Sequence, residues 1–201
     1  MHQFIIKHLL FLGLFLYSSS IWPGLEKAGG FGSGNKEQYF SRNIITAIIM
    51  VYFSGITLTY LLLCYDIVPW AIAENPFTCG VDTLDVVGAV MVLYGTWIRS
   101  SATRTLKKFF TYQVSIKKDH KLITSGPYEK IRHPSYLGTM MALFGLSILL
   151  HMSTYGYLVE GLAMSALPLR IKNEEMVLQQ QFGDDYKKWK ANTNYLIPYV
   201  F

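Results

Sequence analysis

An arginine and a glutamate lie four residues apart near the C-terminus. At this spacing Arg170 and Glu174 share one face of a helix, whereas Glu175 points about 100 degrees away. Only one of the two consecutive carboxylates is therefore expected to line a pocket together with Arg170. A guanidinium so placed binds carboxylates through charge-assisted hydrogen bonds, although an Arg–Glu pair at this spacing is more often a simple surface pair.

A second polar motif, Arg132-His133-Pro134, predicts the start of a helix. The residue before a proline is restricted to extended backbone, and proline is favoured at the first helical position. His133 is therefore expected at the N-terminus of a helix that has Ser135 and Tyr136 in its first turn. Such a helix end attracts an anionic group, while the simpler interpretation is that His133 only caps the helix.

The elements that must position these residues are predicted to be membrane helices. The chain has 201 residues, of which 51% are hydrophobic and only 15% charged, a balance typical of lipid-embedded proteins. Five apolar stretches are predicted as transmembrane helices, the last two forming a hairpin that Pro168 ends or bends: 4–22, 44–65, 84–98, 136–152 and 155–169. A secretory signal peptide competes for the first stretch, but Ser18-Ser19-Ser20-Ile21-Trp22 at its end lacks a clear small-x-small cleavage site and a second span follows. The predicted fold class is an all-α integral membrane protein with about five transmembrane helices.

Basic residues predict the orientation. Of the 18 Lys and Arg residues, 9 lie between 99 and 132 and 5 more between 170 and 190, so both segments are expected to face the cytoplasm. The same rule explains the net charge of +5 without nucleic acid binding. Cys64 and Cys79 fit no metal-ligand spacing, and no metal site is expected. The chain is divided into 1–98, with three membrane helices, and 99–201, with both polar motifs, the helical hairpin and a C-terminal cytoplasmic helix.

A short amphipathic segment is predicted after the second polar helix. Phe182-Gly183 indicates a helix stop, and Tyr186 and Trp189 are expected to rest on the lipid interface beyond it. Both polar segments flank the same hairpin at one membrane face. Their ionisable residues are therefore functional candidates rather than scattered surface charges.

Two segments together resemble a known family. DHKLITSGPYEKIRHPSYLG, followed some thirty residues later by RIKNEEMVLQQQFGDDYKKW and a closing IP, is similar to the isoprenylcysteine carboxyl methyltransferases of the endoplasmic reticulum membrane. The resemblance implies a multi-span enzyme with a cytoplasmic-facing cofactor pocket. Its cofactor would be S-adenosylmethionine, and its partners the lipid bilayer and client proteins that end in a prenylated cysteine, whose carboxylate it would methylate.

The family's site residues carry over to positions of this chain. The resemblance places Arg170 at the position of substrate contact and makes Arg170 and Glu174 the catalytic candidates. The residues implied to bind the cofactor are Gln113, His120, Lys121, Leu122, Ile123, Tyr128, His133, Pro134, Ser135, Tyr136 and Glu174.

The residues fit carboxyl methylation, and an alternative stays open. A C-terminal carboxylate is ionised at neutral pH, so it is already a nucleophile and needs no general base. The alternative is phospholipid N-methyl transfer, in which an ammonium group must first lose a proton and a base such as Glu174, Glu175 or His133 must take it. Arg170 beside the reacting atom disfavours a cationic substrate.

Overall fold

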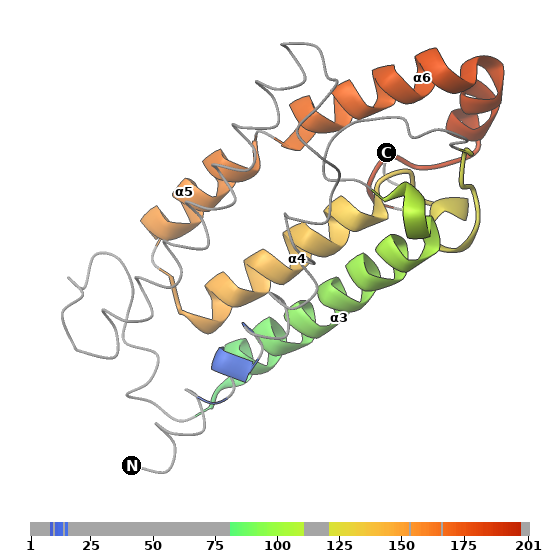
Figure 1. Ribbon diagram of the computed structural model, residues 1–201. Coiled ribbons are helices and arrows are strands. Elements are labelled where there is room, and N and C mark those ends of the chain that lie inside the picture. The colour runs from blue at the N-terminus through green and yellow to red at the C-terminus, as the bar shows by residue number, and fades with distance from the viewer. Residues whose placement is uncertain are drawn as a thin grey trace.

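The described part of the chain is helical. The structure, a computed structural model, describes residues 9, 11–13, 15, 81–110, 121–152, 154–165 and 167–197. Its main helices are α3 (Thr83–Leu106), α4 (Pro134–Leu149), α5 (Thr154–Met164) and α6 (Leu167–Ala191), joined by short 3-10 helices at Lys107–Phe109 and Gly126–Glu129 (Figure 1). The predicted helical class is confirmed for these residues, and a short parallel bridge pairs Ile131 with Asn194.

Helices α3 and α4 pack in close antiparallel contact. Gly88 faces Gly145, and Gly95 faces Gly138. A Cβ atom built on Gly95 would lie 2.6 Å from the Gly138 carbonyl oxygen, and one built on Gly88 would lie 2.8 Å from that of Gly145. The two backbones can approach so closely only because these positions carry no side chain. This packing fixes the start of α4 against the end of α3.

The far end of this pair is held by acidic residues and a histidine. Asp82 and Asp85 form a reciprocal capping box at the start of α3, with both side-chain to backbone hydrogen bonds at 2.9 Å. His151 Nε2, just after α4, lies 3.2 Å from Asp85 Oδ1. The three side chains bring their ligating atoms within 4.8 Å of one another. The capping box and the histidine contact account for this group without an ion.

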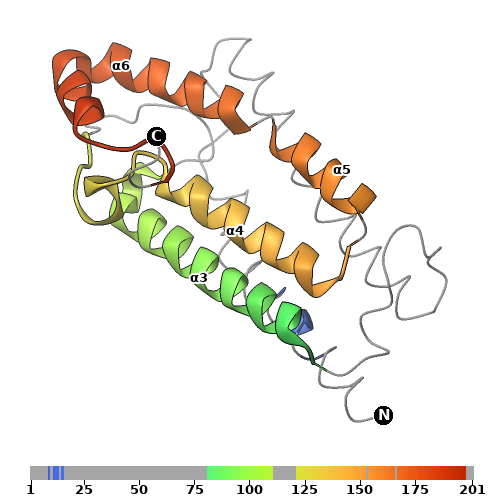
Figure 2. The same cartoon turned by 180° about the vertical axis from the view of Figure 1, so that it is seen from behind.

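Helices α5 and α6 form the other side of the fold. In both views α4 lies between α3 and the α5–α6 pair (Figures 1 and 2). The predicted break near Pro168 is confirmed but falls earlier, because α5 ends at Met164 and Pro168 already lies in the first turn of α6. The first turn is the helical position where a proline, which lacks an N–H donor, does no damage.

Three of the five predicted membrane stretches fall on described helices. The stretches 84–98, 136–152 and 155–169 correspond to α3, α4 and the α5–α6 junction, whereas 44–65 and most of 4–22 lie outside the described residues. None of the described helices combines the length and the apolar character that a membrane crossing requires. The count of five spans therefore stays a prediction. Helix α3 runs through residue 98 to Leu106, so the third predicted span continues without a break past the predicted boundary between 1–98 and 99–201.

The segment after Gly183 behaves differently from the prediction. Gly183 has φ 52° and ψ −119° and kinks α6, which confirms the predicted stop. Tyr186 and Trp189, however, do not rest on a lipid interface. Tyr186 is fully buried, and Trp189 Nε1 donates a hydrogen bond to the Tyr128 carbonyl oxygen at 3.0 Å. The prediction was wrong because the apolar side of this short helix is covered by the protein's own chain.

Candidate functional site

Arg170 and Glu174 meet on one hydroxyl group at the start of α4. Arg170 Nε donates to Tyr136 Oη at 2.6 Å, and Tyr136 Oη donates to Glu174 Oε2 at 2.9 Å. The Arg170 guanidinium also lies 5.9 Å from the Tyr136 ring centre. The predicted shared face of Arg170 and Glu174 is confirmed, and the tyrosine hydroxyl links the cation to the anion.

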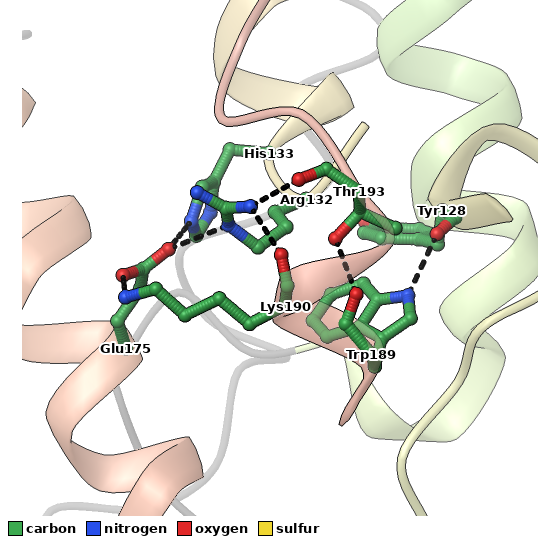
Figure 3. A network of polar contacts seen from close by, with 7 residues as sticks. All are labelled: Tyr128, Arg132, His133, Glu175, Trp189, Lys190 and Thr193. Atoms are coloured by element: carbon green, nitrogen blue, oxygen red, sulfur yellow. Dashed lines mark hydrogen bonds and ion pairs between the residues drawn. The ribbon is translucent and has the colours of Figure 1, made fainter. Parts of the chain in front are cut away.

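Glu175 points to a different set of partners (Figure 3). Its Oε1 accepts from Arg132 Nε at 2.9 Å and lies 3.1 Å from His133 Nε2, and its Oε2 accepts from Lys190 Nζ at 2.5 Å. The expectation that the two carboxylates diverge is therefore confirmed. A structural role for Glu175 could not be predicted from local spacing, because its partners lie 15 to 43 residues away.

Arg132 binds the chain that follows α6. One guanidinium nitrogen, Nη1, donates to the carbonyl oxygens of Lys190, at 3.0 Å, and Thr193 (Figure 3). The Arg132 backbone N–H donates to the Asn194 carbonyl at 2.8 Å, and the Asn194 N–H to the Lys130 carbonyl at 2.9 Å. The segment before α4 and the segment after α6 are therefore joined by both backbone and side-chain hydrogen bonds.

His133 is the N-terminal cap residue of α4, as predicted, and is only 3% exposed. The edges of two tyrosine rings pack against it, with centroid distances of 5.9 Å to Tyr136 and 5.4 Å to Tyr195. Because the Glu175 carboxylate can only accept hydrogen bonds when ionised, the contact between Glu175 and His133 places a proton on His133 Nε2. The imidazole is thus fixed in position, with Nε2 as the nitrogen that donates to Glu175.

Burial and ion pairs shift the pKa values in this cluster. Burial alone would raise the pKa of the Glu175 carboxyl, but hydrogen bonds from His133, Lys190 and Arg132 lower it to about 2. Burial raises the pKa of the Tyr128, Tyr186 and Tyr195 phenols, and a neighbouring glutamate adds to each shift. At neutral pH the cluster therefore holds an ionised carboxylate among protonated phenols.

Arg99 is a site residue that sequence reasoning treated only as a topology signal. It lies on α3, is 7% exposed, and its Nη1 donates to Ser135 Oγ at 3.1 Å and to Thr139 Oγ1 at 2.8 Å. These hydroxyls belong to the first two turns of α4. The glycine contacts between α3 and α4 bring this buried cation to the same helix end as His133 and Tyr136.

The structure brings together most of the remaining residues that the resemblance implies. Tyr128, Pro134 and Ser135 are buried around the start of α4, and Lys121, Leu122 and Ile123 precede it at exposed or half-buried positions. Gln113 and His120 lie outside the described residues. An arginine, a glutamate, a buried histidine and a helix N-terminus converge here, and such a set can hold a ligand that carries both a positive and a negative group.

Comparison with known proteins confirms the resemblance. Residues 86–180 match the isoprenylcysteine carboxyl methyltransferase (ICMT) family. A protein-S-isoprenylcysteine O-methyltransferase of Dictyostelium discoideum is 38% identical, and the match covers 53% of this chain and 46% of that protein. The protein of the same name from Homo sapiens is 30% identical, and the match covers 58% of this chain and 42% of that protein. The chain thus spans about half the length of the curated relatives that it matches.

A solved structure has a similar fold. It is described as the eukaryotic intramembrane Ras methyltransferase ICMT, and it matches with a TM-score of 0.55 and 23% identity. The match covers 96% of this chain and 63% of that one. The likeness shows that this chain and that structure share a similar arrangement of helices.

Proposed function

We propose that this chain is an isoprenylcysteine carboxyl methyltransferase, an integral membrane enzyme that transfers a methyl group to the C-terminal carboxylate of a prenylated cysteine. The observation that carries this proposal is the meeting of Arg170 and Glu174 on the Tyr136 hydroxyl, within 2.6 and 2.9 Å. The segment that contains all three residues is also the segment that matches the ICMT family.

The residues suit S-adenosylmethionine as the methyl donor. The cofactor supplies a methyl group bound to a positively charged sulfur. Glu174 offers a carboxylate for its amino group or a ribose hydroxyl, and the N-terminal end of α4, with buried His133 as its cap, favours an anionic group. Tyr128, Ser135 and Tyr136 surround this helix end, and we assign to the same pocket the other positions that the family resemblance implies.

Arg170 would hold the substrate carboxylate, which is already ionised near pH 7 and needs no base. The Tyr136 hydroxyl fixes the guanidinium from one side, so that Arg170 would orient the carboxylate oxygen toward the methyl donor. Both charges are lost as the ester forms, and a pocket that excludes water favours the less charged transition state. We further propose that the site faces the cytoplasm at the endoplasmic reticulum membrane.

The experiment that tests the function offers two substrates to the protein in membranes. N-acetyl-farnesylcysteine is given in one reaction and phosphatidylethanolamine in the other, each with tritiated S-adenosylmethionine. We expect a base-labile methyl ester on the farnesylcysteine, its loss in Glu174→Gln, and unchanged labelling in Asp184→Asn, a matched change at an exposed carboxylate outside the site. Label in the phospholipid alone would favour amine methylation, and label in neither substrate would contradict the proposal.

A further inference from the structure

The part of α6 beyond Gly183 folds back over the start of α4. We call the segment Asp184–Tyr195 the strap. It begins at the kink and continues as the last two turns of α6, from which the chain runs back toward the start of α4 (Figure 1). Its last residue, Tyr195, contacts His133. The kink uses a positive φ of 52° that side chains with a Cβ atom rarely adopt, and nothing lies within 4 Å of an added Cβ there.

The strap covers two residues that the proposed function assigns to the cofactor pocket. Trp189 of the strap donates to the Tyr128 carbonyl at 3.0 Å, and the Tyr195 ring packs on His133 at 5.4 Å. Both residues are buried, with Tyr128 7% and His133 3% exposed. A ligand that touches both residues lies beneath the strap.

Polar contacts hold the strap closed. Lys190 Nζ reaches Glu175 Oε2 at 2.5 Å, while Arg132 binds the carbonyl oxygens of Lys190 and Thr193 (Figure 3). Glu175 and Arg132 also bind each other, and Glu175 binds His133. Lys190 is the most exposed member, at 46%, and its ammonium group pairs with the same Glu175 carboxylate that binds Arg132 and His133. Lys190 therefore connects the strap to the carboxylate that positions His133, in addition to the Tyr195 ring that packs on His133.

We infer that Lys190 is a positioning residue that keeps the strap closed over the methyl-donor pocket, and that the strap opens at Gly183 when the donor or its demethylated product exchanges. The inference rests on the proposed function for the identity of the ligand. It assigns Lys190 to ligand retention and not to the transfer step, because Lys190 contacts Glu175 and not the Arg170–Tyr136–Glu174 group.

The test compares Lys190→Met with Lys187→Met in the full-length protein. Lys187 is the matched control, since it lies in the same short helix but pairs only with exposed Asp184 in the described structure. The first measurement is tryptic cleavage after Lys188, which both variants retain. The second is the affinity for S-adenosylhomocysteine, and the third is kcat and KM for S-adenosylmethionine.

We expect Lys190→Met to be cleaved faster and to bind S-adenosylhomocysteine about three- to tenfold more weakly, the effect of losing one partly exposed charged contact. KM should rise by a similar factor with kcat nearly unchanged, and Lys190→Arg should restore both cleavage and affinity. S-adenosylhomocysteine should slow cleavage of the unmodified protein.

Equal cleavage and affinity in Lys190→Met and Lys187→Met would overturn the inference. A fall in kcat that follows only the folded fraction would also overturn it, because a purely structural residue behaves in that way. If the unmodified protein bound no S-adenosylhomocysteine and methylated nothing, the proposed function would fail. The cleavage comparison would still decide whether Lys190 holds the strap.

Discussion

Glu174 and Glu175 are neighbours in α6, yet they hold α4 at two different points. Glu174 accepts a hydrogen bond from Tyr136 at 2.9 Å, in the first turn of α4, whereas Glu175 lies 3.1 Å from the cap residue His133. Since successive helical side chains diverge by about 100 degrees, two consecutive carboxylates can reach both sides of one helix end. The paired glutamates thus separate two tasks, orienting Arg170 and fixing His133.

Removing the Tyr136 hydroxyl separates Arg170 from Glu174. We expect Tyr136→Phe to lower kcat by about tenfold or more, because a misplaced guanidinium no longer aligns the carboxylate. KM for the prenylated substrate should also rise. The measurement is methyl transfer to N-acetyl-farnesylcysteine over a range of substrate concentrations.

Tyr94→Phe is the matched control for this loss, since Tyr94 is 51% exposed on α3, away from the site. Tyr94→Phe should leave kcat and KM unchanged. Full activity in Tyr136→Phe would show that the hydroxyl does not orient Arg170.

The Glu175 carboxyl should make stability depend on pH in the acid range. Its pKa is about 2 in the folded protein against a reference of 4.5, so its ionised form stabilises the fold. This contribution is complete above about pH 4.5 and is lost as the pH falls towards 2. We expect the ionised carboxylate to add on the order of 2 kcal/mol to the free energy of unfolding, a value reduced because solvent screens its contact with the exposed Lys190.

The measurement is thermal unfolding of the unmodified protein and Glu175→Gln between pH 7 and pH 3. The gap between their midpoints should narrow as the pH falls. Asp184→Asn is the comparison, because its ion pair with Lys187 is exposed on both sides. A gap that does not change with pH would contradict the assigned role of Glu175.

Local signals in the sequence were enough to predict several features. Pro134 marked the start of α4, Gly183 marked the kink of α6, and the four-residue spacing placed Arg170 and Glu174 on one face. Each of these depends on backbone geometry within a few residues. Such features can be predicted without knowing which helices are neighbours.

Other features depend on contacts between distant segments. The sequence pattern of the helix that carries Tyr186 and Trp189 is compatible with packing against either lipid or protein. The contact between Trp189 and Tyr128, which lies 61 residues away, shows that it packs against protein. Arg99 looked like a charge at a membrane edge, because its partners Ser135 and Thr139 lie 36 and 40 residues further on.

Arg99 should be needed for the shape of the site. We expect Arg99→Met to reduce activity strongly, because Ser135 and Thr139 lose a buried donor at the start of α4. Arg104→Met is the control, since Arg104 is exposed near the end of the same helix. Methyl transfer and thermal unfolding of both variants are the measurements, and equal activity in the two would remove Arg99 from the site.

The glycine contacts between α3 and α4 should be sensitive to a single methyl group. In Gly95→Ala the new Cβ would lie 2.6 Å from the Gly138 carbonyl oxygen and 2.7 Å from the Ala142 nitrogen, both backbone atoms that cannot move aside cheaply. Overpacking of this kind costs about 1–3 kcal/mol and separates the helices, so Arg99 would withdraw from Ser135 and activity would fall together with stability. Gly161→Ala in α5 is the matched control, because nothing lies within 4 Å of its added Cβ and alanine favours a helix. The midpoint temperature of thermal unfolding should therefore fall in Gly95→Ala and rise in Gly161→Ala. An unchanged midpoint and activity in Gly95→Ala would show that the two helices do not pack through their glycines.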